Sequence, residues 1–313
     1  MFALSTFASL MNGLFAIVLA LLGLLIGSFL NVVIARVPRE LSIVRPGSHC
    51  PVCGHPLRWY ENIPLLSWIY QRGRCTSCRA RISWRYPLVE ALTALLFLAC
   101  LQRFGWTGEL ASALMLVVLL IPLTFIDLEH WLLPFALTIP GIALGLLFSL
   151  AQGLQRFQDS AIGAAAGFFG FWAIERLGRK VFKKEALGGG DKYLLALIGA
   201  FLTYRKLLGV VFLASVQGAV VGSVLLALYG RAGPAPAETE PSSQPADPSG
   251  PIGPGTEHEP ALSENGEEDW RPGPTNLPFG PWLALGALEQ LLVAPWLAHL
   301  VPWRALQLLL GGE

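Results

Sequence analysis

Long apolar stretches separated by short polar ones run through the chain from one end to the other. Eight segments reach or approach the roughly 20 apolar residues that a helix needs to cross a bilayer. They lie at about 7–34, 87–103, 109–127, 131–151, 160–177, 192–203, 207–229 and 280–300. The sixth is too short to cross alone, and the glycines before it indicate a broken helix or a longer one that includes them. The pattern predicts an all-α polytopic membrane protein with about eight transmembrane helices.

The composition agrees with this class. Hydrophobic residues make up 54% of the 313 positions and charged residues only 14%, which is unusual for a soluble domain. A formal net charge of +1 argues against a nucleic-acid partner, because binding to phosphates needs a concentrated basic excess. The first apolar segment has no Lys or Arg ahead of it, so we expect it to remain as a transmembrane helix rather than to be a cleaved signal peptide.

The basic residues predict the orientation in the membrane. Of the 22 Lys and Arg residues, 17 fall in the polar segments on one side of the predicted helices. Cytoplasmic loops collect Lys and Arg, so this side is expected to be the cytoplasm. The N-terminus is then outside, and the cysteine-containing loop, Asp127 and Asp191 all face the cytoplasm.

These patterns divide the chain into five parts. We expect transmembrane helix 1 at 1–34, a cytoplasmic loop at 35–86, a transmembrane core at 87–230, a linker at 231–278, and a last transmembrane helix with the C-terminus at 279–313. The linker is acidic, rich in Pro, Gly, Ser and Glu, and nearly free of large apolar side chains. Such a segment cannot bury enough apolar surface to fold, so it is predicted to be disordered.

Four cysteines in the cytoplasmic loop predict a metal site. They form two C-x-x-C pairs, Cys50 with Cys53 and Cys75 with Cys78. Zn²⁺ accepts four thiolates in a tetrahedron, and a closed four-cysteine shell leaves no position for substrate, so the site would be structural. The alternative is two redox-active or disulfide pairs, which a cytoplasmic location disfavours. His49 and His55 flank the first pair as substitute ligands, although four thiolates complete the shell.

Two aspartates carry the candidate chemistry. Asp127 ends an apolar segment, and Asp191 follows three glycines just before another. Carboxylates at membrane depth are costly and point to function, and the predicted topology puts both on one face. Two adjacent carboxyls share a proton and titrate as a pair, which is the chemistry of an aspartic protease. The alternative is structural: Asp127 is an interfacial residue and Asp191 a helix N-cap.

Three further polar residues lie near the aspartates in the sequence. Glu129 and His130 follow Asp127 and are expected to be solvated at the interface, with an accessory acid–base role as the alternative. Glu90 lies early in a predicted helix, where it gains from the helix dipole unless it faces the site.

At these residues the chain resembles the bacterial type IV prepilin leader peptidase and N-methyltransferase family. The resemblance rests on seven blocks in a fixed order: Gly27 to Pro38, the two C-x-x-C pairs, Glu61 to Pro64, Arg85 to Glu90, Asp127, the G-x-G-D at Gly188 to Asp191, and Pro278 to Pro281. It covers nearly the whole chain apart from the linker. By resemblance, the catalytic residues are Asp127 and Asp191, and the metal ligands are Cys50, Cys53, Cys75 and Cys78.

The resemblance implies an inner-membrane enzyme with two activities. It would cut a short basic leader from type IV prepilins or type II secretion pseudopilins, and then methylate the new N-terminal residue with S-adenosylmethionine. No G-x-G-x-x-G after a strand indicates where this cofactor binds. By resemblance alone, Gly27 to Pro38, the cysteine loop and Glu90 are candidates for methyl transfer. Lys192 departs from the family, which often places a lysine one position later.

Three other functions fit parts of the pattern. A leader peptidase without methyltransferase activity, as in archaeal preflagellin peptidases, usually lacks the cysteine loop. A membrane transporter also has broken helices and intramembrane carboxylates, but we find no clear internal repeat, and both aspartates lie at helix ends. A non-enzymatic secretion scaffold would tolerate loss of either aspartate. The specific prepilins and the oligomeric state do not follow from the sequence.

Overall fold

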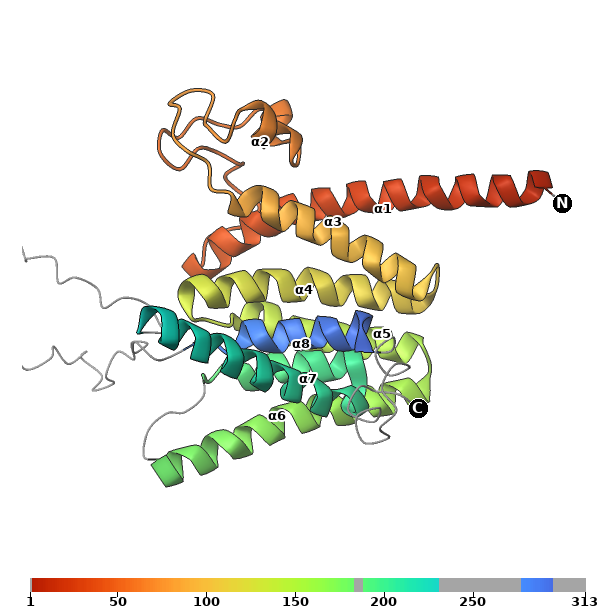
Figure 1. The fold of residues 1–313 in the computed structure, drawn as a ribbon, viewed down its shortest axis with the longest axis vertical. Coiled ribbons are helices and arrows are strands. Elements are labelled where there is room, and N and C mark those ends of the chain that lie inside the picture. Colours follow the sequence, from red (N-terminus) through yellow and green to blue (C-terminus); the bar gives the residue numbers. More distant parts are fainter. Residues whose placement is uncertain (1, 183–187, 231–276, 295–313) are drawn as a thin grey trace, which may run out of the picture. The chain divides into compact units, whose positions relative to one another are not determined.

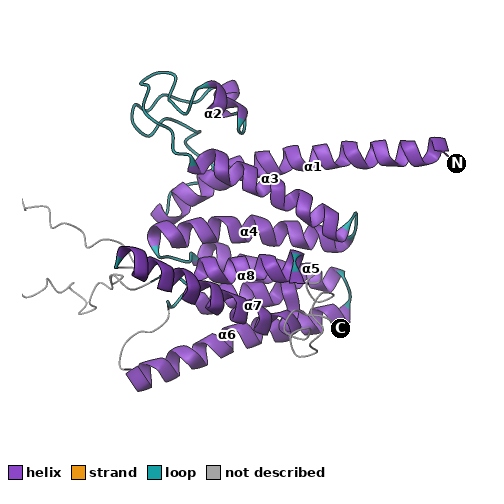
Figure 2. Cartoon of the chain, in the orientation of Figure 1, coloured by secondary structure: helices purple, strands orange, loops and turns teal. Residues whose placement is uncertain are grey.

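The computed structural model describes residues 2–182, 188–230 and 277–294 (Figures 1 and 2). In this part of the chain the secondary structure is helical, without β-strands, and the predicted all-α class is confirmed. The α-helices are α1 (Phe2–Arg36), α2 (Leu66–Tyr70), α3 (Arg85–Phe104), α4 (Gly108–His130), α5 (Phe135–Ala151), α6 (Leu154–Phe182), α7 (Asp191–Tyr229) and α8 (Gly280–Leu292). The predicted disorder of the linker concerns residues that, up to 276, lie outside the described ranges.

Four of the described helices are long and apolar enough to cross a membrane. These spans are Gly13–Arg39, Arg85–Phe104, Gly108–His130 and Asp191–Tyr229, and α5 is apolar but shorter. The chain is therefore a helical protein with several candidate membrane spans, and the total of eight remains a prediction. α7 is interrupted at Thr203, whose φ of 69° and ψ of 168° are not helical. This break lies where the sequence predicts the boundary between the apolar segments 192–203 and 207–229.

The chain forms two compact units. One consists of residues 1–217 and 278–313, and the other of residues 218–277. In the first unit α4 is the central helix, because it packs against α1, α3, α5 and α8. Its side chains are buried around most of its circumference, and Leu116, Val117 and Leu123 are fully enclosed. A helix that is apolar all round is stable only when other helices surround it in this way.

Small residues let the helices approach one another closely. A Cβ atom at Gly27 of α1 would lie 2.7 Å from the Cα of Glu90 on α3. A Cβ at Gly167 of α6 would lie 2.6 Å from the carbonyl oxygen of Leu195 on α7, and Gly163 makes a similar approach one turn earlier. The pair of glycines four residues apart on α6 therefore packs directly against backbone, as such pairs do in membrane helices.

Candidate active site and metal centre

Asp127 and Asp191 are buried at helix ends in the first unit. Asp127 lies in the last turn of α4 and Asp191 is the first residue of α7, and each is only 5% exposed. α4 ends at His130 because Trp131 adopts a left-handed conformation with φ of 55°, and its N–H donates to the Asp127 carbonyl at 3.0 Å. Two acids far apart in the sequence are therefore both buried, one in the last turn of a helix and one at the start of another.

The two carboxyls lie within electrostatic reach of each other. Leu133 connects their surroundings, since a Cβ at Gly190 would lie 2.7 Å from the Leu133 Cβ, and a Cβ at Gly280 would lie 3.5 Å from its Cδ2. The Gly280 backbone is also in contact with the Asp127 carboxylate, so that a Cβ there would collide with Oδ2. The end of α4, the start of α7 and the start of α8 thus converge on one site.

A glycine turn presents Asp191. The Asp191 N–H donates to the Gly188 carbonyl at 3.2 Å, and the N–H of Tyr193 donates to the Gly190 carbonyl at 3.0 Å. Gly188 and Gly189 are exposed, whereas Gly190 is half-buried against Leu133. Because the exposed part of the turn carries no side chains, a peptide backbone can approach the Asp191 carboxyl directly.

One oxygen of the pair has no partner. Asp127 Oδ2 is fully enclosed and makes no hydrogen bond with any residue that the structure describes. A buried carboxylate oxygen without a donor is costly, so it needs a proton, a water molecule or a substrate group. The arrangement suits a carboxyl that exchanges protons with a molecule entering the site.

Two charged residues near the aspartates in the sequence, Lys192 and Glu129, form ion pairs with other side chains. The Lys192 Nζ donates to Glu175 of α6 at 2.9 Å, and Arg85 of α3 donates to both oxygens of Glu129 at 2.7 and 2.5 Å. Glu129 is exposed, in agreement with a solvated interfacial position. These ion pairs join α6 to α7 and α3 to α4, and in the structure they give Lys192 and Glu129 packing partners outside the aspartate pair.

The four predicted cysteines meet in one cluster between α1 and α3. All four Sγ atoms lie within 4.8 Å of one another, with Cys50 and Cys78 at 3.8 Å and Cys53 and Cys75 at 4.0 Å. A tetrahedron of thiolates about 2.3 Å from a central zinc has S–S edges of about 3.8 Å. The cluster could therefore hold a metal ion.

Each C-x-x-C pair is folded by the same backbone hydrogen bonds. In the first pair the Cys50 N–H donates to the His55 carbonyl at 2.9 Å, and the Gly54 N–H donates to the Cys50 carbonyl at 2.9 Å. In the second, Cys75 donates to Ala80 and Arg79 donates to Cys75, at 2.9 and 3.1 Å. The two halves of the site thus have the same local geometry.

The backbone also favours thiolate at the first cysteine of each pair. N–H groups of Cys53 and Val52 donate to the Cys50 sulfur and lower its pKa to about 7. The Cys75 thiol has a lowered pKa for the corresponding reason, with N–H donors from Cys78 and Ser77. Hydrogen bonds to the charged form stabilise it, and thiolate is the form that binds metal.

The structural role of Glu61 was missed by the sequence analysis. Its Oε1 accepts from the Thr76 hydroxyl at 2.5 Å, its Oε2 accepts from the Arg58 N–H at 2.8 Å, and His55 Nε2 lies 3.4 Å from Oε2. The Thr76 hydroxyl, followed by the Arg58 N–H, lowers the Glu61 pKa. Glu61 thus joins the two cysteine pairs, and His55 contacts this carboxylate rather than completing the cysteine cluster. In the sequence, only the position of Glu61 in the Glu61 to Pro64 block indicated that this residue is important.

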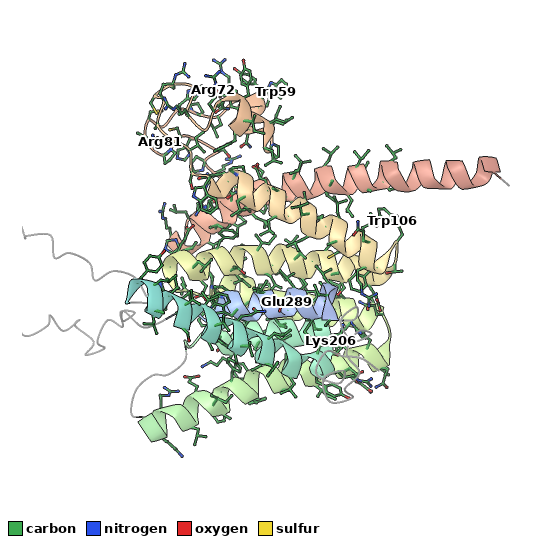
Figure 3. The ribbon with its side chains drawn as sticks, viewed as in Figure 1. Trp59, Arg72, Arg81, Trp106, Lys206 and Glu289 are labelled. Carbon is green, nitrogen blue, oxygen red and sulfur yellow. The ribbon has the colours of Figure 1, made fainter. Side chains whose placement is uncertain are left out.

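Two other residues from the sequence blocks hold the loop and its flanking helices together: Glu90 binds the loop to α3, and Asn31 joins α1 to α3. Glu90 is buried in α3, and its Oε2 accepts from the Leu65 N–H at 2.8 Å. The Asn31 side chain of α1 donates to the Tyr86 carbonyl at 3.1 Å. Figure 3 shows Trp59, Arg72 and Arg81 on the same loop. Glu90 therefore acts as a buried acceptor that holds the loop, and it does so near the N-terminus of α3, where the sequence predicts a favourable interaction with the helix dipole.

Comparison with known proteins is consistent with these features. The bacterial peptidase A24 N-terminal domain matches residues 21–104, and the type IV leader peptidase family matches residues 114–223. A prepilin leader peptidase/N-methyltransferase of Myxococcus xanthus is 52% identical over 96% of both chains. The relative from Neisseria gonorrhoeae is 38% identical over 68% of this chain and 82% of its own, and that from Aeromonas hydrophila 44% over 66% and 80%. No solved structure matches the chain.

Proposed function

The chain belongs to the type IV leader peptidase family, and we propose from this membership that it cuts the leader from type IV prepilins or type II secretion pseudopilins and N-methylates the new N-terminus. The observation that carries the peptidase half is the buried pair Asp127 and Asp191 at the convergence of α4, α7 and α8. The methyltransferase half rests on the relatives' names and on the family blocks around the cysteine loop.

In the proposed mechanism the two aspartates divide the work of hydrolysis. The ionised carboxylate takes a proton from water as the water oxygen attacks the scissile carbonyl carbon. The protonated partner gives its proton to the carbonyl oxygen. When the carbonyl re-forms, one hydroxyl proton returns to the second carboxylate, the C–N bond breaks, and the leaving amine takes a proton from the first carboxyl. Asp127 Oδ2 suits this exchange, because no described side chain donates a hydrogen bond to it.

Replacing Gly280 with alanine tests the site geometry without touching either acid. The new Cβ would meet Asp127 Oδ2 and the Leu133 side chain, so the carboxyl must move. A displacement of about 1 Å costs on the order of 10²-fold in rate, and we expect a loss of that size in leader cleavage by Gly280→Ala.

The matched control for this variant is Gly170→Ala. Gly170 lies in α6, where a Cβ meets no atom within 4 Å, and this variant is expected to cleave at the wild-type rate. Cleavage is followed by gel mobility of a prepilin mixed with purified enzyme. Equal cleavage rates for the two variants would contradict a role for the contact between α8 and Asp127 in positioning that carboxyl.

We also propose that Cys50, Cys53, Cys75 and Cys78 hold a structural Zn²⁺. The sulfur spacing and the matching backbone geometry of the two pairs support this choice. Four thiolates satisfy zinc completely, so the ion would stabilise the loop and leave no open position for substrate. The loop has only short helical segments of its own; Glu61 joins its two cysteine pairs, and the hydrogen bond from Leu65 to Glu90 connects it to α3.

A cavity beside the loop is the proposed place for methyl transfer. It measures about 270 Å³ and lies between α1 and the loop, where it is lined among others by Ser28, Phe29, Val32 and Arg36. The Arg36 guanidinium donates to the carbonyls of Ser42 and Gly47 at 3.0 and 3.3 Å, which holds the loop beside the cavity. Phe29 and Arg36 provide an aromatic surface and a cation for an amino-acid carboxylate. S-adenosylmethionine supplies the methyl group when bound.

Filling this cavity should separate the two activities. Val32→Phe is expected to reduce N-methylation about tenfold or more by displacing the donor, while leader cleavage stays near the wild-type rate. The mass of the mature pilin N-terminus measures both. Val18→Phe on the exposed face of the same helix is the control and should methylate normally. Full methylation by Val32→Phe would place methyl transfer outside this cavity.

The orientation is part of the proposal. We propose eight spans in the bacterial inner membrane from the apolar segments and the family, and the Lys and Arg distribution supports an outside N-terminus and a cytoplasmic face for the aspartates and the cysteine loop. A leader rich in basic residues would then be cut on the side where it is made.

A further inference from the structure

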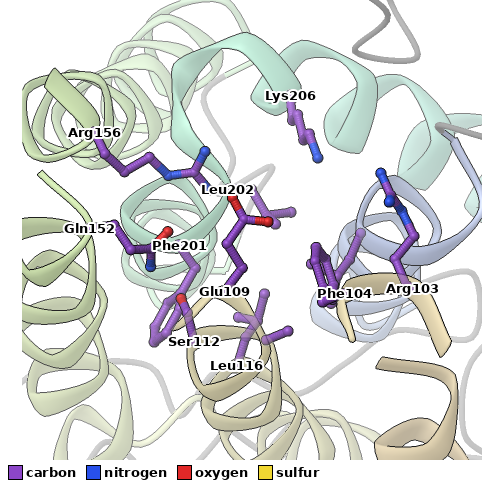
Figure 4. A pocket seen from close by; sticks show the side chains of 12 residues that line it. Arg103, Phe104, Glu109, Ser112, Leu116, Gln152, Arg156, Phe201, Leu202 and Lys206 are labelled. Atoms are coloured by element: carbon purple, nitrogen blue, oxygen red, sulfur yellow. The ribbon is translucent and has the colours of Figure 1, made fainter. Parts of the chain in front are cut away.

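A second cavity lies at the opposite end of the helices from the aspartates. It measures about 340 Å³, within the range of small-molecule sites, and Figure 4 shows its lining. Glu109 of its lining precedes Asp127 by 18 residues on α4, which corresponds to about 27 Å along the helix. This distance is close to the ~30 Å thickness of a bilayer's hydrocarbon core. The cavity thus lies near one membrane–water boundary when the aspartates lie near the other.

Four charged side chains from four helices line the cavity. Arg103 comes from α3, Glu109 from α4, Arg156 from α6 and Lys206 from α7. Lys206 is within electrostatic reach of the other three. Three cations and one carboxylate leave a formal excess of two positive charges in a partly enclosed space.

The cations of this cluster are only partly neutralised by the described protein, through Glu109. Arg103, Arg156 and Lys206 make no ion pair with any residue of the described ranges, and the Arg156 Nε is enclosed without a hydrogen-bond acceptor. Neighbouring Arg205, by contrast, lies 3.9 Å from Asp159. Three like charges with a single opposite charge among them repel one another and are costly to desolvate, so the site favours an anion.

The remaining lining is largely apolar, with Phe104, Leu116, Phe201, Leu202 and Leu291 among its members. A site that pairs cations with an apolar wall at a membrane boundary suits an amphiphile with an anionic head. Basic pockets between transmembrane helices bind phospholipid headgroups in this way. A free phosphate ion would use the cations but gain nothing from the apolar wall.

We propose that this cavity binds the phosphate of an anionic phospholipid from the leaflet at that boundary. Arg103, Arg156 and Lys206 contact the phosphate oxygens, and Glu109 lowers the affinity by opposing the negative charge. The acyl chains leave along the apolar side of the cavity. This site does not depend on leader cleavage, since it lies at the far end of α4 from Asp127.

Native mass spectrometry of the purified full-length protein in detergent tests the proposal. Phosphatidylglycerol is expected to bind with one tight equivalent, and phosphatidylcholine with the same acyl chains at least tenfold more weakly. Lys206→Gln should weaken phosphatidylglycerol binding about tenfold, because it removes a charged hydrogen-bond donor. Arg205→Gln removes the same charge one residue away, outside the cavity, and should change binding less than twofold.

A variant that is expected to bind phosphatidylglycerol more tightly separates loss of the site from loss of the fold. Glu109→Gln removes the only acid of the lining and is expected to tighten phosphatidylglycerol binding several-fold, which a damaged protein would not do. Equal binding of the two lipids, or equal effects of Lys206→Gln and Arg205→Gln, would overturn the proposal. If millimolar sodium phosphate displaces bound phosphatidylglycerol from the protein, the site takes free phosphate, and the lipid assignment is wrong.

Discussion

Asp127→Asn and Asp191→Asn are each expected to slow leader cleavage by at least about 10²–10⁴-fold. An amide has nearly the shape of a carboxyl, but it can neither take a proton from water nor deliver one to the scissile carbonyl. Because the two acids act on the same water and the same bond, the double variant should be no slower than the slower single one. Initial rates on a purified prepilin measure all three.

Loss of fold can be separated from loss of chemistry in these variants. Each substitution replaces one of two buried carboxyls, which cannot both ionise without repulsion, by a neutral amide, so the variants are expected to unfold at the wild-type temperature or above it. Asp159→Asn on α6 is the control, because Asp159 faces Arg205 and lies outside the aspartate pair. A variant of Asp127 or Asp191 that cleaves at the wild-type rate would exclude that residue from catalysis.

The Cys50→Ser/Cys75→Ser double variant is expected to lose the bound zinc and the fold of the loop. Each pair would keep one thiolate, and two thiolates cannot form the closed shell of four. Structural zinc stabilises small zinc-finger peptides by about 10–16 kcal/mol, so its removal should leave residues 50–78 open to protease. Metal analysis of the purified protein and limited proteolysis give the two readouts.

Cys100→Ala is the control for the metal. Cys100 is buried in α3 and takes no part in the cysteine cluster, so this variant should retain the wild-type zinc content. Zinc that stays at one equivalent in Cys50→Ser/Cys75→Ser would contradict the four-cysteine site.

Apolar length and helix-breaking residues were enough to locate the helices. Every predicted apolar segment overlaps a described helix, although the last, 280–300, extends into residues outside the described ranges, and the break at Thr203 separates the two segments expected before and after it. Boundaries were less accurate where polar residues lie in the helix. α6 begins at Leu154 rather than near 160, since Arg156 and Asp159 continue the helix beyond its apolar part. Because these two residues are charged, a search for apolar segments places the start of the helix too late.

The candidate residues were predictable by type, but their partners were not. Asp127 and Asp191 stood out as acids beside apolar segments, and the cysteines by their spacing. The contact of Gly280 with Asp127 and the joining of both cysteine pairs by Glu61 depend on how separate segments pack. The same holds for the cluster of Arg103, Arg156 and Lys206, three isolated charges that only the assembled helices bring together.

The mass of a purified prepilin incubated with the wild-type enzyme and S-adenosylmethionine tests the central claim most directly. We expect loss of the leader at one peptide bond, followed by the gain of a single methyl group on the new N-terminal residue. Without S-adenosylmethionine the leader should still be released and the product remain unmethylated. A precursor that keeps its full mass beside folded enzyme would contradict the account.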